Sequence, residues 1–428
     1  MFRLGLALAV LTGCGGANDV ILPGERIDVR PAMVVENQAP ALALPAPRVN
    51  ADWTHRGGNA QHRLPHPALA ANLTLAFTQD IGAGNNRRHR ITADPIVLDG
   101  RVFTLDSAAQ VSAVSTAGEL LWSHDLTPAG DGASDASGGG MAAQDGTLFV
   151  TTGFGRITAL NAVTGAEIWS QDLNAPGSAA PTVSDGLVFV VSRDSRAWAL
   201  EAETGRIKWQ SDGTPSASNV AGGAGVAVSG DIAIFPFPSG EVLGAFPQGG
   251  LRRWSSIIAG NRVGEAVSVA ANDIGADPVI DGNVIYVGNV SGRVAALRLA
   301  DGERLWTAVT GATSPIWVEA GSLFLVNDIN ELIRLNASDG SITWHVQLPV
   351  FEQEANWRQH TRYVHFGPIL AGGRLIVGSS DGLLRQFDPV SGASLGDVVL
   401  PAGAASLPVV AGNVLYIILE NGQLAALR

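Results

Sequence analysis

A ten-residue pattern recurs along this chain and limits the folds that the chain can adopt. The pattern is Leu-x-x-x-(Thr/Asp/Ser)-Gly-x-x-x-Trp, and its full copies are Leu160–Trp169, Leu200–Trp209, Leu297–Trp306 and Leu335–Trp344. A shortened copy occupies 114–122, Trp254 ends a looser copy, and a degraded copy at 387–396 has glycine in the tryptophan position. Each copy reads as two strands joined by a tight turn, where glycine supplies the positive φ that the turn requires.

Two further turns punctuate each repeat unit, so that each unit contains four short strands. Asp-Gly pairs such as Asp145-Gly146 and Asp185-Gly186 mark one turn, and pairs such as Asp381-Gly382 mark the other. Four strands recurring every 40–50 residues or so are typical of a β-propeller blade. The sequence therefore predicts an all-β fold, an eight-bladed propeller of four-stranded blades. Seven blades remain the alternative if the looser unit at 222–256 is not a blade.

The two ends of the repeat region predict how the ring closes. Residues 72–81 resemble the last strand of a blade without the three strands that should precede it. Residues 407–428 contain three strands, after which the sequence stops. One blade completed by both ends would pair the edges that an open array leaves exposed.

The repeat tryptophans are regularly placed on the outgoing strand, and we interpret them as structural. We expect them to wedge between neighbouring blades, where burial of each ring stabilises the fold. These residues are Trp122, Trp169, Trp209, Trp254, Trp306 and Trp344.

The N-terminal region has a different composition and predicts export. Arg3 precedes a short apolar run at 4–11, which is too short to cross a bilayer and is typical of a signal peptide. Leu11-Thr12-Gly13-Cys14 resembles the bacterial lipobox, which implies cleavage after residue 13 and lipidation of Cys14. Gly15 takes the place of an inner-membrane retention aspartate, which points to an outer-membrane location facing the periplasm. We predict a signal peptide at 1–13, a lipidated cysteine with a flexible Pro/Ala-rich tether at 14–52, and the propeller at 53–428.

Composition and motifs argue against several classes of function. A net charge of −12 provides no basic surface for nucleic acid. The sequence contains no HExxH, CxxC or P-loop motif. His55, His62, His66 and His89 cluster near the propeller entry, and we interpret them as surface residues rather than metal ligands. We therefore expect no catalytic residues, no metal site and no cofactor.

The repeat resembles that of the pyrroloquinoline-quinone propellers over residues 72–428. In the enzymes of that superfamily, the quinone stacks on a pair of adjacent cysteines and a calcium ion is held by carboxylates. Cys14 is the single cysteine of this chain, so that cysteine pair cannot form. A quinoprotein dehydrogenase is therefore the weakest of the functions considered.

A lipobox followed by eight blades of this repeat resembles the BamB family, lipoprotein subunits of the machinery that inserts β-barrels into the outer membrane. The resemblance implies a monomeric scaffold within that complex, which binds the POTRA region of BamA and contacts other subunits. In that family, the loops that join blades three to four and four to five make the contact. The matching positions include Asn219 in the first loop and Asn272, Asp273 and Asp277 in the second. A periplasmic lipoprotein propeller that binds a carbohydrate or another envelope protein is the alternative.

Overall fold

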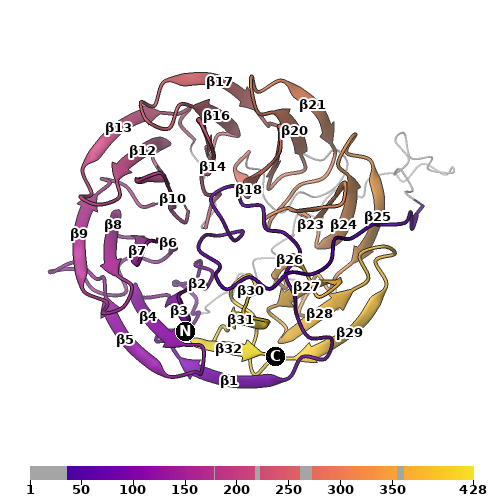
Figure 1. Cartoon of the computed structure of the whole chain (residues 1–428), viewed down its shortest axis with the longest axis horizontal. Coiled ribbons are helices and arrows are strands. Elements are labelled where there is room, and N and C mark those ends of the chain that lie inside the picture. Colours follow the sequence, from indigo (N-terminus) through magenta and orange to yellow (C-terminus); the bar gives the residue numbers. More distant parts are fainter. Residues whose placement is uncertain (1–35, 178, 217–221, 261–271, 354–360) are drawn as a thin grey trace, which may run out of the picture. The chain divides into compact units, whose positions relative to one another are not determined.

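Eight four-stranded antiparallel sheets form a ring of blades in the part of the chain that the structure describes (Figure 1). A computed structural model describes residues 36–177, 179–216, 222–260, 272–353 and 361–428. Residues 35–428 make up one compact unit. The looser fourth repeat is a complete blade, which confirms the eight-bladed prediction and excludes seven.

The first four blades follow one another in chain order, and the first strand of each lies nearest the axis (Figure 1). Blade one consists of β2 (Ile96–Leu98), β3 (Arg101–Leu105), β4 (Gln110–Ser115) and β5 (Leu120–Asp125). Blade two consists of β6 (Gly139–Gln144), β7 (Thr147–Thr152), β8 (Arg156–Asn161) and β9 (Glu167–Asp172). Blade three consists of β10 (Thr182–Ser184), β11 (Leu187–Ser192), β12 (Arg196–Glu201) and β13 (Ile207–Asp212). Blade four consists of β14 (Ala227–Ser229), β15 (Ile232–Pro236), β16 (Glu241–Ala245) and β17 (Arg252–Ile257).

The remaining blades complete the ring. Blade five consists of β18 (Ile274–Asp281), β19 (Val284–Asn289), β20 (Val294–Arg298) and β21 (Arg304–Ala308). Blade six consists of β22 (Trp317–Glu319), β23 (Ser322–Val326), β24 (Glu331–Asn336) and β25 (Ile342–Gln347). Blade seven consists of β26 (His365–Ala371), β27 (Arg374–Ser379), β28 (Leu383–Phe387) and β29 (Ser394–Val399). Blade eight consists of β30 (Val409–Ala411), β31 (Val414–Ile418), β32 (Gln423–Leu427) and β1 (Leu75–Asp80).

Blade eight closes the ring as the two chain ends predicted. Strand β1 runs antiparallel to β32, with Phe77 opposite Ala426 and Asp80 opposite Gln423. Backbone hydrogen bonds in both directions between Thr74 and Arg428 continue the pairing beyond the strands. The N-terminal strand therefore covers the edge that β32 would otherwise expose.

Each repeat tryptophan lies between its own blade and the next one. The Trp122 indole N–H donates a hydrogen bond to Ala162 O at 3.2 Å, in the turn that joins β8 to β9. Gly165 in the same turn has φ +72°, and a Cβ atom added there would lie 2.6 Å from Trp122 Cδ2. The repeat therefore needs glycine both for the turn and for close approach of the preceding indole. The same donation recurs from Trp169 to Ala202, Trp209 to Pro247, Trp254 to Leu299, Trp306 to Ala337 and Trp344 to Pro389.

Burial within a blade falls from the axis to the rim. Strand β12 is buried except at its two ends, whereas β13, the outermost strand of the same blade, alternates between exposed and half-buried residues. The core therefore lies in and between the inner strands, and the rim presents the eight outermost strands to solvent. The described residues contain no helix of the length and apolarity needed to cross a membrane.

The predicted flexible tether does not hold for its last part, residues 37–52. Gln38 N donates to Thr343 O at 2.9 Å, and the Asn37 side chain hydrogen-bonds both the backbone N–H and the carbonyl of His345. Arg334 Nη1 reaches Pro40 O at 3.2 Å. This stretch therefore starts on the outer edge of β25 and then continues toward the axis (Figure 1).

Candidate functional site

A segment of the entry region, residues 50–67, circles the axis at one end of the ring; we call it the girdle (Figure 1). Its polar contacts reach all eight blades in the order in which the blades follow one another. The contacting pairs are Asn50–Val410, Trp53–Val97, Thr54–Ala143, His55–Val183, Ala60–Val228, Gln61–Ile280, Arg63–Glu319 and Pro67–Gly372. The partners lie close to the turns between the first and second strands of the blades. We call this side the girdle face and the opposite side, with the connections between blades, the loop face.

Arg56 is the charged centre of the girdle. Its Nε lies 3.2 Å from Asp94 Oδ2 and 3.2 Å from Asp277 Oδ2, and its Nη1 donates to Gly223 O at 2.9 Å. The side chains of Arg56, Asp94 and Asp277 are only 14%, 8% and 0% exposed. Asp94 precedes blade one and Asp277 lies in blade five, so a single guanidinium links the girdle to opposite sides of the ring. Charges removed from water to this extent must be paired.

Burial shifts the proton affinities of this cluster. Desolvation raises the pKa of Asp94 to about 6, although the Arg56 charge opposes the shift. Burial lowers the pKa of Arg56, but the two carboxylates outweigh burial and the pKa is raised overall. Burial lowers the pKa of His55 to about 4 and also lowers the pKa of His62. Both imidazoles are therefore neutral at neutral pH.

The prediction of surface histidines is wrong for three of the four residues. His55, His62 and His66 are 4%, 5% and 2% exposed, because each turns inward from the girdle. His62 Nδ1 lies 2.9 Å from Pro278 O, and His66 Nε2 accepts a hydrogen bond from Gly373 N at 2.7 Å. These rings thus join the girdle to blade backbones, whereas His89 is half-buried. No group of three His, Cys, Asp or Glu residues suited to a metal ion occurs in the described ranges.

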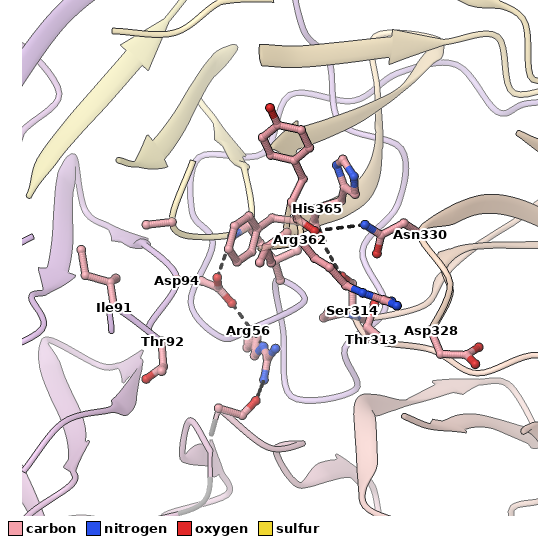
Figure 2. A pocket seen from close by; sticks show the side chains of 17 residues that line it. Arg56, Ile91, Thr92, Asp94, Thr313, Ser314, Asp328, Asn330, Arg362 and His365 are labelled. Atoms are coloured by element: carbon pink, nitrogen blue, oxygen red, sulfur yellow. Dashed lines mark hydrogen bonds and ion pairs between the residues drawn. The ribbon is translucent and has the colours of Figure 1, made fainter. Parts of the chain in front are cut away.

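A cavity of about 350 Å³ opens at the loop-face end of the axis (Figure 2). Arg56 and Asp94 of the charged cluster line it, and so do Ser314, Asn330 and Arg362 from connections and turns of the blades around it. Arg362 is exposed, with its guanidinium carbon 5.1 Å from the ring centroid of Phe351.

The histidine at this cavity has a structural role. His365 is 4% exposed, its Nδ1 lies 2.7 Å from Ser379 Oγ, and its Nε2 lies 2.8 Å from Pro349 O. Because both ring nitrogens are occupied and burial lowers its pKa, this imidazole is not available as a general base. The cavity offers charge and hydrogen bonds for binding a ligand, without an activated nucleophile among its described residues.

The structure corrects the role predicted for two of the partner-contact residues. Asp273 is 3% exposed and Asp277 is fully buried, and Asp277 lies inside β18 rather than in a loop. Asp277 Oδ1 accepts a hydrogen bond from Gly225 N at 2.6 Å while Oδ2 pairs with Arg56. Both carboxylates are therefore buried in the folded chain rather than presented to a partner, and the fold itself uses that of Asp277. Asn272 is exposed, and Asn219 lies outside the described residues.

Asp277 nonetheless organises the region in which partner contact was predicted. Its bond from Gly225 N, together with the bond that its partner Arg56 donates to Gly223 O, joins the end of the connection between blades three and four to the first strand of blade five. The start of the same connection is held by Glu241, whose Oε2 accepts hydrogen bonds from Thr214 N at 2.8 Å and Thr214 Oγ1 at 2.7 Å. Sequence reasoning missed Arg56 and Asp94, because no motif surrounds either residue.

Comparison of the sequence with known proteins finds a matching family. The family described as outer membrane protein assembly factor BamB matches residues 107–346, more than half of the chain. A protein of that name from Legionella pneumophila is 28% identical over 214 residues, 50% of this chain, and the match spans about half (52%) of that relative. A protein of the same name from Salmonella typhimurium is 28% identical over 369 residues, 85% of this chain and 91% of that protein.

Solved structures support the same fold. BamB from Moraxella catarrhalis superposes with a TM-score of 0.67 at 16% identity, covering 83% of this chain and all of that one. A europium-containing methanol dehydrogenase superposes with a TM-score of 0.65 at 13% identity, covering 88% and 98%. At such identities the likeness concerns the fold alone, and a propeller of this type serves both assembly factors and enzymes. The family match does not depend on the fold alone, and it places this chain in the BamB family of outer membrane protein assembly factors.

Proposed function

We propose that this protein is a non-catalytic scaffold subunit of the outer-membrane β-barrel assembly complex. It binds the POTRA region of BamA, contacts other subunits of the complex, and aids insertion of outer-membrane proteins. The observation that carries the proposal is the match of more than half of the chain to the BamB family. The buried network of Arg56, Asp94 and Asp277 agrees with a rigid scaffold, since it fixes the loop face without providing a reactive group.

The loop face between blades three and five is the proposed contact surface. The connection between blades three and four begins and ends on this face, where the bonds from Thr214 N to Glu241 and from Gly225 N to Asp277 hold its two ends. Asn272, at the start of blade five, is exposed and available for contact. Loops positioned by a rigid scaffold are common sites of recognition.

A lipid on Cys14 would hold the propeller at the periplasmic side of the outer membrane, where its proposed partners also lie. An acyl chain contributes about 0.8 kcal/mol of membrane affinity for each buried CH₂ group. Growth in radiolabelled palmitate tests this part of the proposal, because the wild type should be labelled whereas Cys14→Ser should not.

The binding proposal is tested by affinity capture of the full-length, C-terminally tagged lipoprotein from gently solubilised envelopes. The wild type should recover BamA, and Asn272→Arg should recover several-fold less. Asn283→Arg is the matched control, because Asn283 is also exposed and lies at the other end of β18, on the girdle face. Equal recovery by both variants would remove Asn272 from the interface, and clean absence of BamA with the wild type would refute the proposed function.

The axial cavity favours one alternative, a periplasmic propeller that binds a carbohydrate or another envelope protein through its charged and polar lining. Recovery of a glycan or an unrelated envelope protein in the same capture would support it. A quinoprotein dehydrogenase is the weakest candidate, because one cysteine cannot form the adjacent pair on which the quinone stacks. Stoichiometric quinone in the absorbance and mass spectra of the purified protein would overturn that rejection.

A further inference from the structure

One blade of the ring lacks the aromatic wedge that the others carry. In register, Gly396 of β29 lies opposite Gln386, as Trp169 lies opposite Ala159 in blade two. A Cβ atom added at Gly396 would meet no heavy atom within 4 Å, so the position where an indole would begin is open space. In blade eight the wedge is Phe77, whose ring lies 2.8 Å from the position of a Cβ on Gly118 of blade one.

A groove lies between blades seven and eight, beside the position of the missing wedge. Its volume is about 470 Å³, and it is lined by Ala71–Leu73 on the blade-eight side and by Arg374, Gln386 and Leu395–Val398 on the blade-seven side. A groove of about 570 Å³ between blades two and three is lined by residues of β6, β7 and β10 and of the turn at 201–204, but by none of β9, which carries Trp169. The groove at blade seven is lined by residues of the outermost strand, β29, because that strand carries no indole.

Arg374 gives the groove its chemistry. The Arg374 residue is 6% exposed, and its guanidinium donates hydrogen bonds to Gly372 O, Ala70 O and Gln386 Oε1. Among the described residues no carboxylate forms a salt bridge with it, and burial lowers its pKa. A cation without a counterion is stabilised by the electron-rich face of an aromatic ring, most strongly that of tryptophan. Leu395, which lines the groove, is 56% exposed and adds apolar surface.

The rim of this propeller also accepts an extended chain. Strand β29 is the outermost strand of its sheet. On blade six the edge of the equivalent strand β25 already accepts one backbone hydrogen bond, from Gln38 N to Thr343 O at 2.9 Å, and His345 N donates to the Asn37 side-chain oxygen at 3.0 Å. An extended segment placed alongside β29 would therefore repeat an interaction that this chain makes with itself, and alternate side chains of such a segment face the sheet.

We propose that the groove between blades seven and eight binds an aromatic side chain, above all tryptophan, carried on an extended segment of a partner polypeptide that pairs with β29. The inserted ring would lie in the space left open at Gly396, against Arg374 rather than against the turn glycine that receives the chain's own aromatic residues at the other seven junctions. This surface lies on the rim, so it is separate from the loop face proposed to bind BamA, and the two proposals fail independently.

The test uses a defined peptide and the full chain. The probe is the acetylated and amidated heptapeptide AEIWSQD, a copy of residues 166–172 with 5-fluorotryptophan, observed by ¹⁹F NMR. We expect saturable binding with a Kd at or below about 1 mM. Unlabelled twins with alanine or glutamate at the tryptophan position should compete about tenfold less well or worse, since an indole contributes most of the buried apolar area. Equal competition by either twin, or no saturation, would overturn the proposal.

Two variants locate the site. Ala71 is exposed on the groove wall, so Ala71→Trp should fill the groove, leave the thermal unfolding unchanged and weaken the probe about tenfold. Val163→Trp is the control, because Val163 is 57% exposed in the C-terminal turn of blade two, away from the groove. Asn72→Trp serves if Ala71→Trp unfolds. Unchanged affinity in a folded groove variant, or a concentration-dependent dimer that Ala71→Trp abolishes, would also overturn the proposal.

Discussion

Removing the guanidinium of Arg56 is the sharpest test of how the ring is held at its axis. Arg56 lies 3.2 Å from each of two carboxylates whose side chains are 8% and 0% exposed. Arg56→Leu keeps apolar volume but leaves Asp94 and Asp277 without their counterion. Loss of one partner of a buried ion pair typically costs about 3–5 kcal/mol, because the remaining charge stays desolvated. We expect a decrease of that size in the free energy of unfolding at pH 7.

Urea titration followed by far-UV circular dichroism and tryptophan fluorescence measures this loss. A double-mutant cycle with Asp277→Asn separates pairing from packing, and the double variant should cost about 1–3 kcal/mol less than the sum of the single variants. Arg156→Leu is the control, because Arg156 pairs with Asp172 at the surface, where the side chains are 41% and 61% exposed. Its loss should be below about 1 kcal/mol.

The reasoning fails if Arg56→Leu costs no more than Arg156→Leu, or if the single losses in the cycle add. Either result would mean that the girdle is held by its backbone contacts and that the charged centre contributes nothing of its own. A loss in the free energy of unfolding that lies between these limits would be informative as well. Because the pKa of Asp94 is already raised to about 6, protonation of Asp94 in the variant would reduce the loss below pH 6.

Two further predictions follow from the wedges and from the buried titratable groups. Trp344→Ala should lower the free energy of unfolding by about 3–5 kcal/mol, because Trp344 is 0% exposed. Trp169→Ala should lower it by less, because Trp169 is half-buried. Equal losses in urea titrations would contradict the link between the loss and burial. Lowering the pH from 6.5 to 4 should destabilise the chain through His55, whose pKa is lower folded than unfolded, and stabilise it through Asp94, whose pKa is higher folded than unfolded. Asp94→Asn removes the opposing contribution, so the variant should lose about 2 kcal/mol more than the wild type over this interval. Parallel pH profiles of the urea midpoint would refute it.

The blades were predictable because their signals are local. A turn glycine such as Gly165 and a tryptophan such as Trp169 lie within one short hairpin, and the strand pattern around them has a period of two. Ring closure was also predictable, because the missing strands at one end of the repeat region match the single strand at the other. Both inferences depend on counting units rather than on knowing any contact between distant residues.

The girdle and the charged centre could not be predicted in this way. Arg56 pairs with a carboxylate 221 residues further along the chain, and nothing near either residue signals the pairing. The three buried histidines look like surface residues in the sequence, since polar side chains in a segment without strand periodicity usually face solvent. Their burial depends on eight first strands that surround the axis and offer backbone partners to one segment. Asp277 was predicted to contact a partner because its position matches a contact loop of the BamB family, but its charge pairs with Arg56 inside the ring.

The degraded repeat at 387–396 shows how an irregularity in a periodic sequence can be related to the way the ring closes. A wedge tryptophan packs on the glycine of the turn between the third and fourth strands of the following blade. Blade eight has no such turn, because its third strand ends at Leu427 and its fourth begins at Leu75. A tryptophan at position 396 of blade seven would therefore lack the turn glycine and carbonyl that the others use. The glycine at this position therefore agrees with a ring that closes through β1 and β32, where no turn between the third and fourth strands is present to receive an indole.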